Sequence, residues 1–416
     1  MRNKTAKVLF NLLIITIFFN VWFPKAGIKL AGIPLTVGNV FLGLTFVLWF
    51  LLKIRDRKIK ITKLGFIIIS GTFYFILKYI LIVSKFSNIA AYMTYIIPLI
   101  IYPLMFFLTA DIIDSKEKAD KVFKVIYYGF MFLCFYSLLQ FFFGIEKTAI
   151  PGLTVNLTDY RTMGSQWFLQ KSNGVDVSSA KIVSTYQNGN LLGINLLLLY
   201  PIIYLALKKK DKGFEVMFSL ILFIGCTFLT LSRTAWLGIV LFIFFGILFE
   251  RDRTKKSFLV RFLLIILCII CIIFVFNFMP SVANRFLDTS PSDWISMSGR
   301  TEGLIKVIDS VSKSNSFLAW IIGPTGIINF SGLAYEMLPL SLFAQTGFIG
   351  MILLYFIFIK FILFKSNNYI FKGVKLSIII WLIIGIIECG YWLPPTAVNI
   401  FMILALGYNC MIFEKE

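Results

Sequence analysis

Residues 214–249 read FEVMFSLILFIGCTFLTLSRTAWLGIVLFIFFGILF, two apolar runs that are interrupted only by Leu231, Ser232, Arg233 and Thr234. A helix rises ~1.5 Å per residue, so each run is long enough to span the roughly 30 Å hydrocarbon core of a bilayer. A connection this short leaves two helices antiparallel and adjacent. The stretch therefore predicts a helical hairpin that crosses a membrane.

The rest of the chain follows the same pattern. Its 416 residues are 59% hydrophobic and 14% charged, with a mean hydropathy of +0.89. We expect an all-α, polytopic integral membrane protein that folds as a single domain over 1–416. The first apolar run follows basic residues as in a signal peptide, but no small-residue cleavage site follows it, so we expect a retained helix. The twelve predicted spans are 8–23, 33–52, 64–83, 89–109, 122–143, 188–207, 214–231, 234–249, 258–279, 338–363, 374–393 and 396–413.

The distribution of charge predicts an orientation. Most of the 40 Lys and Arg residues fall in alternate loops, on the same side as the N-terminus. By the positive-inside rule that side is cytoplasmic, so the net charge of +20 indicates topology and not nucleic-acid binding. We expect both termini in the cytoplasm, the chain in a bacterial inner membrane, and the long segments 144–187 and 280–337 outside. From Thr301 onward, apolar residues recur at helical spacing, which predicts an amphipathic helix on the outer membrane surface.

The His and Cys content limits the kinds of catalytic or metal site that the chain can hold. The chain has no His, which is the commonest metal ligand and the usual catalytic base. All six Cys lie in apolar runs, and the pair Cys268 and Cys271 lies inside a predicted helix with no loop to enclose a metal. We interpret the cysteines as small buried residues, and we expect neither a metal nor another cofactor.

Two outward-facing arginines begin predicted helices. Ser232 is a natural N-cap for the eighth span, and Arg233 follows it in the first turn. Ser298, Gly299 and Arg300 repeat this arrangement in the second long loop. A cation beside free backbone N–H groups favours anions, and two guanidinium groups could hold a pyrophosphate from two sides. The alternatives are that Arg233 contacts lipid phosphates and that Arg300 is a solvated loop residue.

Further polar residues lie at the predicted outer ends of other spans. Asn188 and Asn190 open the sixth span, where they either offer amides to a ligand or simply cap the helix. Glu336, next to Tyr335, precedes the tenth span and could deprotonate a sugar hydroxyl, or could only favour the helix dipole. Glu388 lies within the eleventh predicted span, where a carboxylate is costly, and Lys78 or an outward arginine could be its partner.

Taken in order, four features resemble the superfamily of O-antigen and capsule polymerases (Wzy-type) and O-antigen ligases. They are the Asn-rich start of a span at 186–190, Leu231-Ser232-Arg233, Ser298-Gly299-Arg300 and the run that ends in Gln345-Thr-Gly347-Phe-Ile-Gly350. The resemblance implies a GT-C-like helical fold and a metal-independent glycosyltransferase that uses undecaprenyl-diphosphate-linked glycans.

The resemblance also implies roles for individual residues. Arg233 and Arg300 match the family arginines that hold the lipid diphosphate, and Glu336 lies where ligases carry a His as the proposed base. The lack of that His favours a polymerase, which transfers a growing glycan onto the next lipid-linked repeat unit, over a ligase-like transferase. Arg161 and Arg285 in the outer loops are candidates for binding the glycan, as are Ser232, Asn188, Asn190, Tyr335 and Glu388.

The implied partners are the lipid-linked oligosaccharide, membrane lipid and a chain-length regulator protein. The product would be capsule or lipopolysaccharide glycan. A lipid-glycan flippase or another transporter is the main alternative, and a membrane scaffold is a further one. Transporters tend to place charges at the bilayer midplane, whereas the spans here are nearly free of charge.

Overall fold

A computed structural model describes most of the chain. It covers residues 2–30, 33–56, 61–82, 102–163, 181–249, 317–323, 337–388, 390 and 394–415, with isolated helical residues between 266 and 313. Its long helices are α1 (Arg2–Trp22), α2 (Val37–Asp56), α3 (Lys63–Ile82), α6 (Lys116–Phe143), α10 (Gly189–Lys209), α11 (Gly213–Leu229), α12 (Arg233–Phe249), α17 (Leu338–Leu363), α18 (Tyr369–Ile384) and α19 (Pro394–Lys415). Shorter elements are α5 (Leu104–Ile112), α7 (Ile145–Thr148), α8 (Leu157–Met163), α16 (Phe317–Ile322), β1 (Gly27–Leu30) and β2 (Ile33–Thr36).

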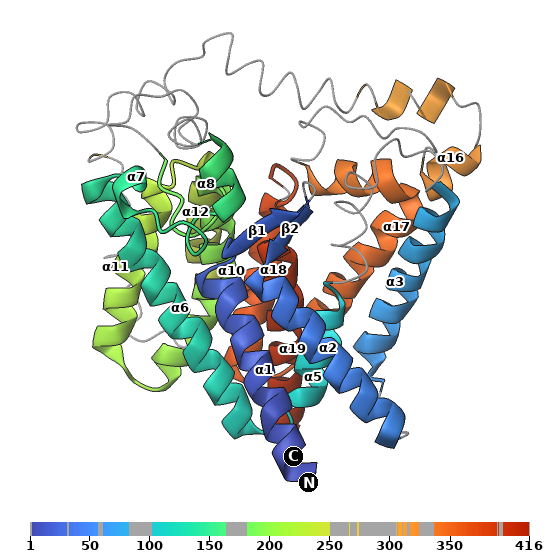
Figure 1. The fold of residues 1–416 in the computed structure, drawn as a ribbon, viewed down its shortest axis with the longest axis horizontal. Helices are drawn as coiled ribbons and strands as arrows, with labels where there is room; N and C mark the ends of the chain where they lie inside the picture. The colour runs from blue at the N-terminus through green and yellow to red at the C-terminus, as the bar shows by residue number, and fades with distance from the viewer. Residues whose placement is uncertain are drawn as a thin grey trace.

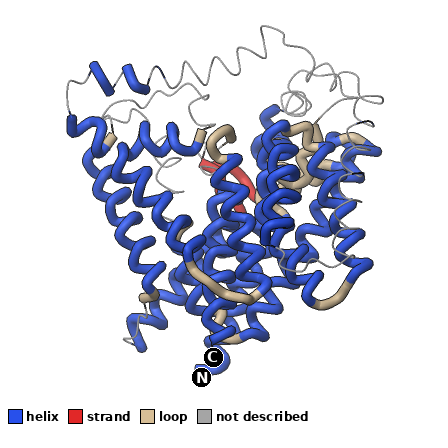
Figure 2. The backbone as a smooth tube through the Cα atoms, turned by 180° about the vertical axis from the view of Figure 1, so that it is seen from behind, coloured by secondary structure: helices blue, strands red, loops and turns tan. Residues whose placement is uncertain are grey.

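The long helices form a bundle with distinct ends (Figure 1). Both termini lie at one end, while α7, α8, α16 and the two strands gather at the other. We call these the inner end and the outer end, following the predicted orientation. Termini at the same end agree with the predicted even number of crossings, and helices dominate the chain in every view (Figure 2).

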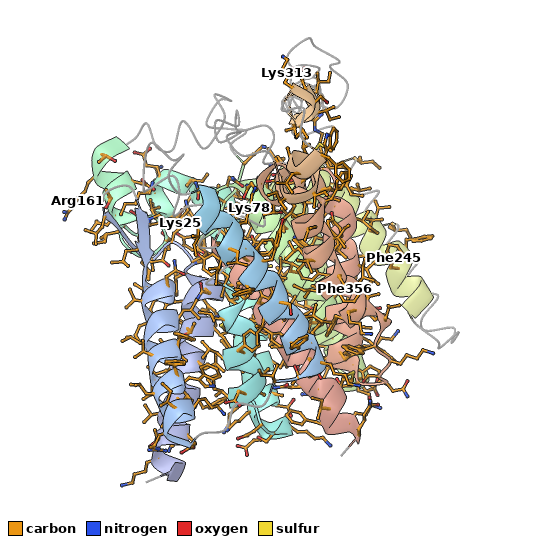
Figure 3. The ribbon with its side chains drawn as sticks, turned by 90° about the vertical axis from the view of Figure 1, so that its right-hand side faces the viewer. Lys25, Lys78, Arg161, Phe245, Lys313 and Phe356 are labelled. Atoms are coloured by element: carbon orange, nitrogen blue, oxygen red, sulfur yellow. The ribbon has the colours of Figure 1, made fainter. Side chains whose placement is uncertain are left out.

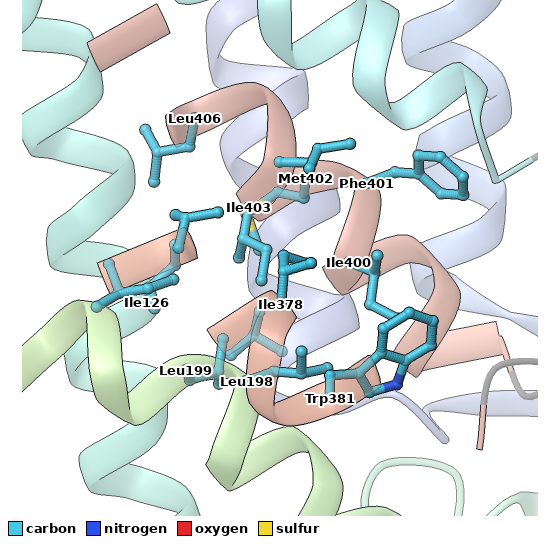
Figure 4. Packing of buried hydrophobic residues seen from close by; sticks show 14 of the residues in the cluster. Ile126, Leu198, Leu199, Ile378, Trp381, Ile400, Phe401, Met402, Ile403 and Leu406 are labelled. Atoms are coloured by element: carbon cyan, nitrogen blue, oxygen red, sulfur yellow. The ribbon is translucent and has the colours of Figure 1, made fainter. Parts of the chain in front are cut away.

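The centre of the bundle is built from α10, α18 and α19. Nearly every residue of α10 is buried, from Gly189 to Leu207. Figure 4 shows Leu198 and Leu199 of α10 packed with Ile378 and Trp381 of α18 and with residues of α19. A helix that is apolar on all sides belongs in the interior of a large assembly of helices, which explains the absence of an amphipathic pattern.

Peripheral helices are apolar on the outside instead. On α2, the side chains of Val40, Leu44, Val47 and Leu51 are all more than two-fifths exposed. Their spacing of three and four residues places them on one face, and the buried Leu42 and other core residues lie on the opposite face. An exposed apolar stripe of this length suits contact with lipid tails rather than with water.

The described residues include six helices that are long and apolar enough to cross a membrane: α1, α2, α6, α10, α17 and α19, while α11 and α12 are shorter apolar helices. A mostly helical, multi-pass membrane protein is therefore confirmed. The total of twelve spans and the GT-C-like arrangement stay predictions. Most of span 258–279 and most of span 89–109 lie outside the described residues.

A small β-hairpin departs from the all-α prediction. Residues 33–36, expected to begin the second span, form β2 and pair antiparallel with β1, with Gly27 opposite Thr36. The span begins only at Val37, because the hydroxyl of Thr36 accepts the N–H of Asn39 and caps the helix, at 3.2 Å. Lys29 of β1 forms an ion pair of 2.6 Å with Asp159 of α8. The hairpin and α8 are thus joined at the outer end.

Candidate functional site

The turn between α11 and α12 has the predicted capping geometry. Leu231 has a φ of +50°, which turns the chain sharply after α11. The hydroxyl of Ser232 then accepts the N–H of Ala235 at 3.3 Å, so Ser232 is the N-cap of α12, as predicted. The side chain of Ser232 is buried, whereas Arg233 is exposed at the first position of the helix. The turn therefore presents a cation at the outer end beside backbone N–H groups that lack helical partners.

The start of α10 packs directly against this turn. A Cβ atom on Gly189 would lie 2.5 Å from the carbonyl oxygen of Thr230, and one on Gly193 would lie 2.5 Å from the Cβ of Ala235. Real Cβ atoms do not come this close to other atoms, so both positions must be glycine for α10 to pack against the turn. Two helix N-termini, those of α10 and α12, are thereby held side by side at the outer end.

We expect Gly189→Ala to disturb this contact, because the new methyl group would meet the backbone oxygens of Thr230 and Ile182. Overpacking of this kind costs roughly 1–3 kcal/mol. Thermal unfolding of the purified protein in detergent should show the loss. Gly225→Ala on the neighbouring α11 is the matched control, since no atom lies within 4 Å of the added carbon. Equal stability of the two variants would contradict the described packing.

The two asparagines at the start of α10 have different roles. The side-chain oxygen of Asn188 accepts the N–H of Leu191 at 2.9 Å, which is ordinary N-capping and the plainer of its two predicted interpretations. Asn190 instead donates from Nδ2 to Oε2 of Glu388 at 3.2 Å. The first turn of α10 thus joins a carboxylate on one side to the Arg233 turn on the other.

The sequence predicted that Glu388 lies within a membrane-spanning helix, but the structure places it outside one. Helix α18 ends at Ile384, and Glu388 follows in the turns beyond it. The helix ends there because the carbonyl of Gly385 accepts the N–H of Leu338 at 2.8 Å, which joins the end of α18 to the start of α17. Asn190 is a partner of Glu388 that the sequence did not indicate, and the half-buried residue lies near the outer end, as expected, but beyond the end of the helix.

The remaining predicted site residues are distributed as follows. Arg161 is exposed on α8. The described hydrogen bond and ion pair between α8 and the rest of the protein go to Lys29 of β1 and not to the N-termini of α10 and α12. The other four, Arg285, Arg300, Tyr335 and Glu336, lie outside the described residues. Leu338, whose N–H binds Gly385, follows Glu336 by two positions in the sequence.

The predicted surface helix is described only in part. Val307 and Val311 are helical and fully buried, while Ile305 and Ile308 are exposed. The buried valines pack with Ala319 of α16 and with Leu340, Phe343 and Ala344 of α17. Among the residues that the structure describes, no three His, Cys, Asp or Glu side chains are grouped as metal ligands.

A comparison with known families finds a similarity in one part of the chain. Residues 218–319 match a family model described as O-antigen ligase. The resemblance to the O-antigen polymerase and ligase superfamily is confirmed. The match includes Ser232, Arg233, Arg285 and Arg300, and it ends before Glu336. No curated protein and no solved structure matches the chain.

Proposed function

We propose that the chain is a polysaccharide polymerase that transfers an undecaprenyl-diphosphate-linked glycan onto another lipid-linked repeat unit at the outer face of the inner membrane. The match to the O-antigen ligase family supports a membrane glycan transferase. The lack of His in the chain favours the polymerase branch. The single observation that carries the proposal is the placement of Arg233 and two helix N-termini together at the outer end.

The positive charge at the outer end suits the following glycan-transfer reaction. An acceptor sugar hydroxyl attacks the anomeric carbon of the donor glycan, the bond from that carbon to the lipid diphosphate breaks, and the diphosphate leaves with the electron pair. Arg233, with Arg300 as its proposed partner, stabilises the developing negative charge, which is usually the largest contribution in such a transfer. A carboxylate takes the proton of the acceptor hydroxyl.

Two carboxylates are candidates for this base. Glu336 is the candidate from the family resemblance, and Glu388 is the carboxylate that Asn190 joins to the first turn of α10. Removing a general base slows a reaction by roughly 10²- to 10⁴-fold. We expect Glu336→Gln to show such a loss. Glu388→Gln, which keeps an acceptor oxygen for Asn190, should change the rate less than tenfold, as expected of a substrate-binding residue.

These two variants are compared by measuring the rate of chain extension with a lipid-linked repeat unit in proteoliposomes. The reverse ranking, with the large loss in Glu388→Gln, would move the base to Glu388. Full activity in both variants would contradict a carboxylate base at either position.

The proposed function is tested by deleting the gene and analysing the envelope glycan of the source strain. Loss of a polymerase leaves single repeat units attached at the cell surface. The family description also favours a ligase-like transferase, whose loss would leave long glycan on the lipid carrier. Loss of a flippase would leave repeat units inside the cell. Either of the last two results would overturn the polymerase proposal.

A further inference from the structure

Helix α17 is broken in its interior. Gly347 has φ 67° and ψ −171°, a non-helical conformation between the segments 338–346 and 348–363. A break of this kind removes helical hydrogen bonds, and backbone groups at membrane depth need partners within the protein. The carbonyl groups beside the break therefore need hydrogen-bond donors from neighbouring elements.

The end of α16 fits into this break. Gly323, directly after α16, has a φ of +88°. A Cβ on Gly347 would lie 2.2 Å from the backbone nitrogen of Gly323, and a Cβ on Gly323 would lie 2.8 Å from the backbone nitrogen of Gly347. Two glycines from separate parts of the chain thus pack backbone against backbone. The break in α17 and the end of α16 form a single structural unit.

Helix α3 supplies donors to both parts of this unit. The hydroxyl of Tyr74 donates to the carbonyl of Thr346 at 2.6 Å, directly before the break. Lys78, one turn later on the same face of α3, donates from Nζ to the carbonyl of Gly323 at 3.1 Å. Gly350 lets the tyrosine approach, since a Cβ there would lie 3.0 Å from its Cε1.

The burial of Lys78 is the decisive feature. A lysine near the end of a membrane helix ordinarily extends its amine to the membrane surface. Lys78 lies toward the outer end of α3 (Figure 3). It is only 3% exposed, so its side chain is buried in the protein. A buried cation in an apolar span is costly and indicates a specific role. Its bond to Gly323 joins α3 to the end of α16.

We propose that Tyr74 and Lys78 are positioning residues that form an α3 clamp on the α16–α17 break. The clamp holds Gly323, which directly precedes segment 324–336 in the sequence, and Thr346 of α17, the helix that follows this segment. Segment 324–336 carries Glu336, the candidate base. Only this catalytic consequence rests on the proposed function; the clamp itself rests on the described contacts.

Hydrogen exchange of the full-length protein in lipid nanodiscs tests the clamp. Lys78→Met removes the donor and keeps a similar apolar volume, and we expect the amides of 317–323 and 343–350 to exchange about tenfold faster than in the unmodified protein. Lys78→Arg keeps a donor and should restore most of the protection. Tyr74→Phe removes one hydroxyl and should loosen 343–350. Ser70→Ala is the matched control, since its exposed hydroxyl bonds only to its own helix at Phe66.

Unchanged exchange in Lys78→Met, or equal exchange in Lys78→Met and Lys78→Arg, would overturn the proposal. Where Lys78→Met does not yield folded protein, Tyr74→Phe decides: faster exchange confined to 343–350 supports the clamp, and unchanged exchange overturns it. In the transfer assay, a positioning role predicts a lower kcat with an unchanged KM in Lys78→Met. Faster exchange in a protein that shows no transfer activity would retain the clamp and overturn the proposed function alone.

Discussion

Replacing Gly347 by alanine is expected to destabilise the protein at the break in α17. The backbone there has φ 67° and ψ −171°, a region that is essentially restricted to glycine. The added Cβ would also lie 2.2 Å from the nitrogen of Gly323 and 2.3 Å from the oxygen of Ile321. Strain and overpacking together cost about 3 kcal/mol. Thermal unfolding in detergent, followed by the yield of monodisperse protein, measures the loss.

Gly43→Ala is the control for this prediction. Gly43 lies in α2, and no atom comes within 4 Å of an added Cβ. Alanine favours a helix over glycine by about 1 kcal/mol, so this variant should be as stable as the unmodified protein or slightly more stable. A Gly347→Ala protein that unfolds at the same temperature as Gly43→Ala would contradict the described break in α17.

Replacing Arg233 by alanine is expected to lower the rate of glycan transfer by about 10²- to 10³-fold. Removing one fixed group that stabilises developing charge has effects of this size in enzymes. Lysine keeps the charge but loses the bidentate geometry, so Arg233→Lys should retain an intermediate rate. Since Arg233 is exposed, neither change should alter the unfolding temperature. Chain extension in proteoliposomes measures the rate.

Arg55→Ala is the matched control for the loss of one arginine. Arg55 lies in the last turn of α2 at the inner end and pairs with Asp56 on the surface. This variant should extend glycan at the unmodified rate. Equal rates for Arg233→Ala and Arg55→Ala would show that the α11–α12 turn does not contribute to the reaction.

The helices were largely predictable because each one had to be apolar over most of its length. Span 214–231 is α11 from Gly213 to Leu229, and span 122–143 is the outer part of α6. The β-hairpin was missed because residues 33–36 are as apolar as the span they precede. Their strand pairing is fixed by contacts with distant residues such as Gly152, whose carbonyl accepts the N–H of Gly27.

The sequence predicted the contacts of the candidate site only where a residue caps a helix that begins next to it. Ser232 caps α12 through a residue three positions away, which the sequence pattern shows directly. The pair of Asn190 and Glu388 spans 198 positions, and the bond of Lys78 to Gly323 spans 245. Such contacts depend on how helices pack, which periodicity does not encode. A charged Lys78 in an apolar span was the one visible signal of the clamp.

Labelling of single cysteines in intact cells tests the central claim most directly, that the Arg233 end of the bundle faces away from the cytoplasm. In a background without the six native cysteines, Arg233→Cys and Lys210→Cys place a thiol at the outer and the inner end of the α10–α12 unit. A membrane-impermeant maleimide should label Arg233→Cys in intact cells and Lys210→Cys only after permeabilisation. Labelling of Lys210→Cys in intact cells, with Arg233→Cys protected, would place the turn in the cytoplasm, where no outward transfer can occur.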